Sequence, residues 1–265
     1  MRMVEALDTA QRDGEKQDPR FLTSVARGFR VLEALSVHYG AMSLTELSRK
    51  TDLTVPTLQR LTATLVEAGY VEKEPSSKRY GLTVKTVDLL FSYLSRNQFA
   101  ERAWPHLVHL RETLGVSISM SIPLQDSMIY VHRLAAYAGD FENTLPGKKI
   151  PLCLSAAGRC VLSQQPRQVV ERYLAQVTIP ALTPFSLTDP AKILAEIDLC
   201  RVRGYALVKR ETSPGLMTIA CPAMRGKTAI AGISAHVPLA GNDEEAFVAK
   251  VLQPVVSVSH ALSAG

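Results

Sequence analysis

The side chains best suited to contact nucleic acid lie in the segment 43–83. Gln59 and Arg60 are neighbours there, within the sequence LTVPTLQRLTATL. A glutamine amide can form two hydrogen bonds with adenine, and a guanidinium group can form two with guanine; each pair is worth about 1–3 kcal/mol of discrimination between bases. Arg60 could equally contact a phosphate. We therefore predict a surface for double-stranded DNA, formed by Arg27, Thr54, Val55, Thr57, Gln59, Arg60, Lys78 and Arg79.

Two short helices would have to position these side chains. Ser43 and Glu46 have the spacing of a capping box, in which each side chain satisfies a backbone N–H at the start of a helix. A second helix is expected to begin at Thr54, with Pro56 in its first turn, where the missing N–H costs little. Leucines at helical spacing would face inward, and Gly69 suits a left-handed end of this helix.

A small β-ribbon is predicted to follow the second helix. Residues 70–74 and 79–82 read as two strands joined by a turn at 75–78. Lys78 and Arg79 at its tip suit contact with phosphate or with the minor groove. Together these elements make a winged helix-turn-helix, whose second helix has the dimensions to enter a major groove. The alternatives are a helical hairpin inside a larger domain and a winged helix that contacts only protein.

The composition is that of an ordinary globular protein with a mild preference for polyanions. The 265 residues are 46% hydrophobic and 21% charged, with a net charge of +5. Four cysteines without CxxC spacing lie in apolar segments and indicate reduced thiols. No apolar run approaches the roughly 20 residues of a membrane span, and the N-terminus lacks the apolar core of a signal peptide. We therefore expect a soluble cytoplasmic protein that uses no membrane and has a disordered arm over residues 1–20.

The chain is predicted to divide into a DNA-binding domain over residues 21–82, a linker helix over 83–98 and a second domain over 99–265. An apolar stripe in the first helix would cover the back of the two later helices. This stripe consists of Val25, Phe29, Leu32 and Leu35. The linker helix is so apolar that it needs a partner, either the same helix of a second subunit or the chain's own C-terminal domain.

The second domain is predicted to be α+β. Two pairs of antiparallel strands would turn at Gln125-Asp126 and at Arg225-Gly226, with helices before, between and after them. One helix has Asp189 as its N-cap and Gly204 at its end. The first helix is expected to bend or restart at Pro105, and the last, over residues 243–262, to be interrupted at Pro254.

A catalytic role is the alternative from a different class of function. Cys153 or Cys160 could act as a nucleophile with His132 or His236 as a base. No motif brings these residues together, and apolar flanks indicate inert thiols. The six histidines show no metal-binding spacing and the chain has no phosphate loop. We predict a protein that is not an enzyme and holds neither metal nor cofactor.

Several motifs in order resemble the IclR family of bacterial transcriptional regulators, over nearly everything from Phe21 to Leu262. They are Thr23–Gly28, Leu44–Leu47, Thr57–Leu61, Leu65–Tyr70, Tyr80–Leu82, Ile150–Gly158, Gly204-Tyr205 and the stretch from Glu211 through Gly215 to Pro222. The resemblance implies a winged helix-turn-helix, a linker helix and a GAF-like effector-binding domain with an antiparallel sheet. It also implies dimers, often paired into tetramers, on operator DNA. The segment 18–28 is most similar to the branch that controls aromatic-acid catabolism, including protocatechuate and 4-hydroxybenzoate pathways.

The resemblance also implies which residues surround the effector. They are Ile150, Ala156, Ala157, Leu216, Thr218, Ser234 and His236. The chain departs from many members at Val208, where they have an acidic residue, and at Thr218, where they have cysteine or serine, so a glyoxylate-type effector is not implied. His236 could be cationic or donate to an anion, which favours a small organic acid, although a purely structural histidine is the alternative.

Overall fold

The computed structural model describes residues 20–38, 40–136, 145–241 and 243–264. Nearly all of the predicted arm lies outside these residues. The chain forms two compact units, one ending at Asn97 and the other continuing from Gln98. Each unit is described by itself.

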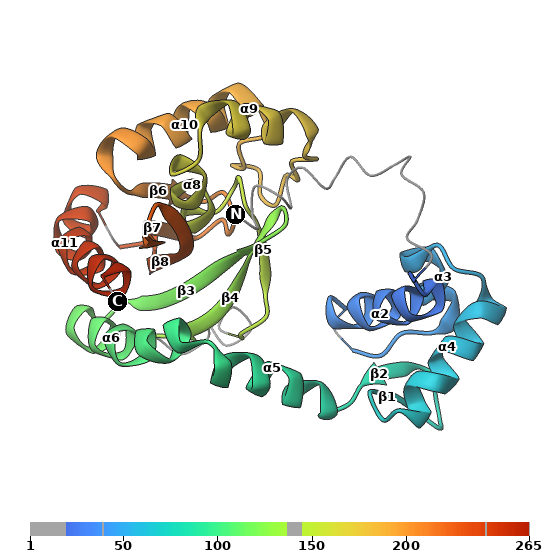
Figure 1. The fold of residues 1–265 in the computed structure, drawn as a ribbon. Helices are drawn as coiled ribbons and strands as arrows, with labels where there is room; N and C mark the ends of the chain where they lie inside the picture. Colours follow the sequence, from blue (N-terminus) through green and yellow to red (C-terminus); the bar gives the residue numbers. More distant parts are fainter. Residues whose placement is uncertain (1–19, 39, 137–144, 242, 265) are drawn as a thin grey trace. The chain divides into compact units, whose positions relative to one another are not determined.

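The N-terminal unit is the predicted winged helix-turn-helix (Figure 1). Its elements are α2 (Thr23–Ser36), α3 (Leu44–Thr51), α4 (Val55–Glu67), β1 (Val71–Lys73), β2 (Tyr80–Leu82) and α5 (Lys85–Arg96). The capping box forms, because the backbone N–H of Ser43 donates to Glu46 at 2.7 Å and the backbone N–H of Glu46 donates to Ser43 Oγ at 3.3 Å. Gly69 follows α4 with a φ of 76°, the left-handed conformation that favours glycine.

The predicted stripe on α2 is only half right. Leu35 is buried, but the side chains of Val25 and Phe29 are 50% and 58% exposed. The buried face of α2 is instead formed by Val31, Ala34 and Leu35, which pack with residues of α3, α4 and the ribbon. The domain core therefore covers only the C-terminal half of this helix, and the N-terminal half keeps an apolar surface.

Helix α5 has no buried residue. Its most exposed large apolar side chains are Val84, at the N-cap, and Phe91, with 83% and 70% of their surface accessible. Val87, Leu89 and Tyr93 are also exposed. None of the described residues covers these apolar side chains, so the prediction that this helix needs a partner still stands.

The second unit is built on a six-stranded antiparallel sheet in the order β5-β4-β3-β8-β7-β6 (Figure 1). Its strands are β3 (Ser117–Leu124), β4 (Ser127–Leu134), β5 (Lys149–Pro151), β6 (Ala206–Lys209), β7 (Leu216–Arg225) and β8 (Thr228–Pro238). Its helices are α6 (Gln98–Leu114), α8 (Ala156–Ser163), α9 (Arg167–Gln176), α10 (Pro190–Arg203) and α11 (Glu244–Ser263). Helices α6 and α11 pack together against the sheet, α8 packs against β7 and β8, and α10 packs behind α8. The α+β prediction is confirmed.

Neither proline interrupts its helix, so the restart allowed for at Pro105 and the interruption expected at Pro254 do not occur. Pro105 lies inside the continuous helix α6 and Pro254 inside α11. A proline in a helix interior costs about 3 kcal/mol. Buried side chains lie on both sides of each proline, for example Val251 and Val255 in α11, so that packing against the sheet holds both halves in one helix.

Helix α11 is long and apolar enough to span a membrane by length and composition, contrary to the prediction that no such run exists. It belongs to the core of the second unit, because its Phe247, Val251, Val255 and Leu262 are buried where it packs on β7, β8 and α6.

Candidate functional site

The solvent side of α4 carries the residues predicted to read DNA. Leu58 and Thr62 are buried and hold the helix to its domain, whereas Gln59 and Arg60 are exposed. Thr54 and Val55 are exposed at the start of the helix. Thr54 is the N-cap residue as predicted, although its hydroxyl bonds to the hydroxyl of Thr57 at 2.9 Å instead of capping the backbone. The arrangement leaves an amide and a guanidinium side by side for base edges or phosphates.

The ribbon holds its two predicted cations in different ways. Lys78 is exposed in the turn, with a φ of 58°. Arg79 is turned back into its own domain, where Nε donates to the carbonyl of Ala41 at 2.8 Å and Nη2 pairs with Glu46 at 2.6 Å. The backbone N–H of Ser43 and the Arg79 guanidinium lower the pKa of Glu46 to about 2. Arg79 therefore fixes the ribbon to the capping box of α3.

Arg27 is exposed on α2, in keeping with a phosphate contact. Its neighbour Arg30 donates to the carbonyl of Thr51 at 3.4 Å, which ties α2 to the end of α3. Arg27 thus remains part of the predicted DNA surface, and Arg30 contributes to its scaffold.

Three of the predicted effector residues share one face of the large sheet. Thr218 lies directly opposite His236 across β7 and β8, and Ser234 is two residues before His236. Side chains two apart on a strand, and those of directly opposed residues, point to the same face. All three are buried. Leu216 begins β7 on the same side, while Ile150 lies on β5, separated from β7 by β4, β3 and β8.

The surroundings of His236 favour the neutral imidazole over the cation that the sequence also allowed. Its Nε2 lies 2.7 Å from the hydroxyl of Ser119, and its Nδ1 lies 3.0 Å from the hydroxyl of Thr218. Burial lowers its pKa well below the usual value, and the nearby charge of Arg133 lowers it further. In the neutral imidazole one ring nitrogen donates and the other accepts, so that His236 orders the two hydroxyl groups.

Strands β3 and β4 also contribute side chains to this face, which was not predicted from the sequence. Ser117, Ser119 and Ser121 are all buried, and the hydroxyl of Ser121 has no hydrogen-bond partner among the described residues. Burying an unpaired hydroxyl costs about 1–3 kcal/mol, so this group indicates a place where a ligand could donate or accept. The alternation of these serines with apolar residues was visible in the sequence and could have identified them.

A β-bulge brings an aromatic ring and a cation to the same face. Ser119 pairs with Arg133 and Ser121 with Tyr130, so that Val131 is the extra residue of β4. The Arg133 guanidinium carbon lies 4.6 Å from the centre of the Tyr130 ring, and the centres of the Tyr130 and His236 rings lie 6.5 Å apart in an edge-to-face arrangement. A bulge cannot be read from alternation alone, because one inserted residue reverses which side chains point inward.

Helix α8 approaches this face closely through the predicted small residues. A Cβ atom added to Gly232 of β8 would lie 2.6 Å from the Cβ of Ala157, so that only glycine fits there. Ser155 caps the helix by accepting the backbone N–H of Gly158 at 3.0 Å. Ala156 and Ala157 are buried in the first turn.

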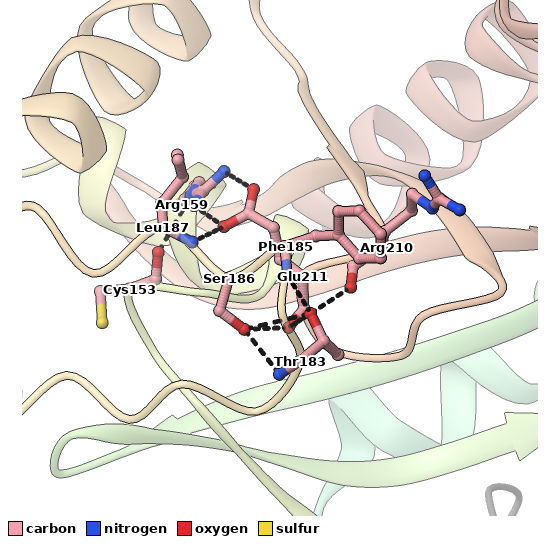
Figure 2. Close-up of polar contacts among 8 residues, drawn as sticks. All are labelled: Cys153, Arg159, Thr183, Phe185, Ser186, Leu187, Arg210 and Glu211. Atoms are coloured by element: carbon pink, nitrogen blue, oxygen red, sulfur yellow. Dashed lines mark hydrogen bonds and ion pairs between the residues drawn. The ribbon is translucent and has the colours of Figure 1, made fainter.

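A buried ion pair joins the segments that carry the predicted effector residues (Figure 2). The Arg159 guanidinium on α8 donates to both carboxylate oxygens of Glu211, at 2.8 and 2.6 Å, and its Nε donates to the carbonyl of Cys153 at 2.9 Å. Glu211 also accepts the backbone N–H of Leu187, and its carbonyl accepts the hydroxyl of Ser186 at 2.7 Å. This network fixes the chain before β7 to the start of α8.

The cysteines and histidines do not form catalytic pairs in the described residues. The Cys160 thiol donates to the carbonyl of Ala220 at 2.8 Å, and burial raises the pKa of this thiol and of Cys153. His132 Nε2 bonds to the carbonyl of Ala100 at 2.9 Å. Neither thiol is therefore an activated nucleophile.

Two family models together match most of the chain. Residues 91–264 match the family model described as the bacterial transcriptional regulator IclR C-terminal domain, and residues 24–75 match the IclR helix-turn-helix domain. The chain is 28% identical over 206 residues to the Pca regulon regulatory protein of Pseudomonas putida, covering 77% of this chain and 70% of that protein.

Solved structures of similar chains share the fold. An IclR transcriptional regulator from Alicyclobacillus acidocaldarius superposes with a TM-score of 0.80 at 25% identity, covering 92% of this chain and 98% of that one. An IclR homologue from Microbacterium hydrocarbonoxydans, solved in complex with 4-hydroxybenzoate, gives a TM-score of 0.74 at 21% identity, covering 91% of this chain and all of the other.

These relatives are regulators of transcription and not enzymes. A helix-turn-helix unit with an exposed reading helix and a second unit of matching fold are the two parts that a ligand-responsive regulator requires. The chain belongs to the IclR family of bacterial transcriptional regulators.

Proposed function

We propose that this regulator reads operator DNA with the exposed face of α4. The observation that carries the proposal is the placement of Gln59 and Arg60 on the solvent side of a helix that Leu58 and Thr62 hold to the domain core. Arg27 and Lys78, both exposed, supply phosphate contacts, and Arg79 positions the ribbon through Glu46. Because its target is the bacterial chromosome, the protein acts in the cytoplasm.

The ligand of the second unit is a small organic acid, and an aromatic acid fits the site best. The guanidinium of Arg133 is the natural partner of a carboxylate. The Tyr130 ring offers contact for a ring, and the Ser121 hydroxyl, which lies opposite Tyr130 across β3 and β4, offers a hydrogen bond. The names of the relatives support the same class, since one controls a Pca regulon and another was solved with 4-hydroxybenzoate.

The working form is a dimer, or a tetramer built from two dimers. The exposed apolar side chains of α5 are covered by the same helix of a second subunit. A ligand that binds one arrangement of the dimer more tightly than another, by a few kcal/mol, changes the spacing of the two reading helices.

Calorimetry with a panel of aromatic and aliphatic acids tests the effector class. We expect saturable binding of an aromatic acid such as 4-hydroxybenzoate, and its loss in Arg133→Gln. Arg225→Gln, at the exposed last residue of β7, serves as the matched control. Equal binding of Arg133→Gln and the control would exclude Arg133 as the carboxylate contact, and binding of non-acidic compounds alone would exclude the class.

A further inference from the structure

A hollow of about 350 Å³ lies beside α4 in the N-terminal unit. It lies between one side of α4, the ribbon and the start of α3. Its lining consists of Leu44, Gln59, Ala63, Val66, Lys73 and Tyr80. Of the residues that line the hollow, only Gln59 belongs to the predicted DNA surface, and none belongs to the predicted effector site.

The two walls of the hollow differ in chemistry. On α4, Gln59, Ala63 and Val66 are spaced by four and three residues, so they form a single row along one side of the helix. On the ribbon, Lys73 is directly opposite Tyr80, and its Nζ lies 5.4 Å from the centre of the Tyr80 ring. Directly opposed residues share a face, so Lys73 and Tyr80 point to the hollow and Glu72 points away from it.

The charge of the lining is therefore positive. Lys73 is the one charged residue among the six that line the hollow, and its side chain is exposed. Ala63, Val66 and Tyr80 give the remaining surface an apolar character. An occupant should combine a negative group near the ribbon with an apolar or weakly polar body against α4.

We propose that this hollow seats the sugar–phosphate backbone of one operator strand. Lys73 binds a phosphate, and a neighbouring deoxyribose lies against Ala63 and Val66. The inference rests on the proposed reading of DNA by α4. A helix that enters a major groove has a phosphate strand beside it, and contacts to that strand fix the register of the helix on the bases.

The position of Gln59 favours DNA over a free small molecule in this hollow. Its side chain lies both in the row that lines the hollow and on the exposed surface beside Arg60. A backbone seated between α4 and the ribbon brings the attached base edges towards this amide. The contact at Lys73 would thus position Gln59 for readout while carrying no sequence information itself.

Titration of Lys73→Gln against two duplexes tests the assignment. One duplex is selected by the wild-type protein from a random pool, and the other is an unrelated sequence. We expect roughly tenfold weaker binding to both duplexes, as for loss of a charged hydrogen bond. The slope of the logarithm of the binding constant against the logarithm of the salt concentration should become shallower by about one for each Lys73 that contacts a phosphate. Lys250→Gln, which changes the same charge on an exposed position of α11, serves as the control.

Replacing single phosphates of the selected duplex by neutral methylphosphonates locates the contact. At the phosphate that Lys73 contacts in each half-site, the substitution should weaken binding of the wild-type protein but not weaken Lys73→Gln any further, whereas at the phosphates contacted by other residues it should weaken both proteins. Unchanged affinity and salt dependence of Lys73→Gln, while the wild-type protein binds the selected duplex, would overturn the inference and leave the reading by α4 standing. A wild-type protein that selects no duplex at all would overturn both.

Discussion

The imidazole of His236 is held between two hydroxyl groups in the interior of the second unit, and its burial makes one contribution to stability depend on pH. Burial lowers its pKa, whereas the same side chain in the unfolded chain titrates near 6.5. Below about pH 6.5 the unfolded chain therefore binds more protons than the folded one. The contribution of the neutral imidazole to stability is complete above that pH and is lost as the pH falls.

Thermal unfolding between pH 8 and pH 5 tests this prediction at the level of one residue. We expect the melting temperature to fall below about pH 6.5, and the fall to be smaller in His236→Gln. His132 also has a pKa lowered by burial, so His132→Gln measures its separate share. A His236 ring whose NMR signals titrate near pH 6.5 in the folded protein would contradict the buried neutral state.

The unpaired hydroxyl of Ser121 predicts opposite effects on stability and on ligand binding. Removing it in Ser121→Ala should raise the free energy of unfolding by about 1 kcal/mol, because a buried group without a partner disappears. The same change should weaken binding of the organic acid in calorimetry. Ser121→Ala that destabilises the protein and leaves binding unchanged would show that the hydroxyl serves the fold instead.

Arg79 illustrates what residue types can and cannot reveal. Its charge and its place near the turn predict a DNA contact, and the pattern of residues gives no warning of its pairing with Glu46, which is distant in sequence. The capping box of Ser43 and Glu46 was predictable because it is local. The third member of that network arises only when the ribbon folds back on α3.

At the scale of elements, helices and strands with clear periodicity were predictable. The strand pairs across residues 125–126 and 225–226, and the helix between Asp189 and Gly204, form as expected. The short strands β5 and β6 were missed, because three or four residues carry too little alternation to be recognised. The uninterrupted α6 and α11 depend on packing against the sheet, which outweighs the local preference of proline.

The Arg159–Glu211 pair makes a prediction about how α8 is attached to the start of β7. Arg159→Met or Glu211→Leu alone should lower the free energy of unfolding by about 3–5 kcal/mol, because each leaves one buried charge without its partner. The double variant should recover much of that loss. Denaturant titration of the three variants measures the coupling, and additive losses would show that the two charges do not depend on each other.

At the scale of the whole molecule, the apolar surface of α5 predicts association. Phe91→Glu places a charge on the most exposed aromatic side chain of this helix, whereas Ser92→Glu places the same charge on a neighbouring exposed position. In sedimentation, Phe91→Glu should shift the protein towards monomer and Ser92→Glu should not. A dimer that withstands Phe91→Glu unchanged would mean that another surface joins the subunits.

The central claim is that the exposed side of α4 reads base sequence while the ribbon contacts phosphate, and a gel-shift comparison of Arg60→Ala with Lys78→Ala tests it most directly. Arg60→Ala should lose specific binding, by an amount equivalent to about 1–3 kcal/mol for each base pair read, and should keep its affinity for unrelated DNA. Lys78→Ala should weaken both duplexes alike and flatten the salt dependence. If Arg60→Ala binds the selected operator as the wild-type protein does, Arg60 does not read DNA; if both variants weaken all sequences equally, Arg60 contacts phosphate and the reading of bases lies elsewhere.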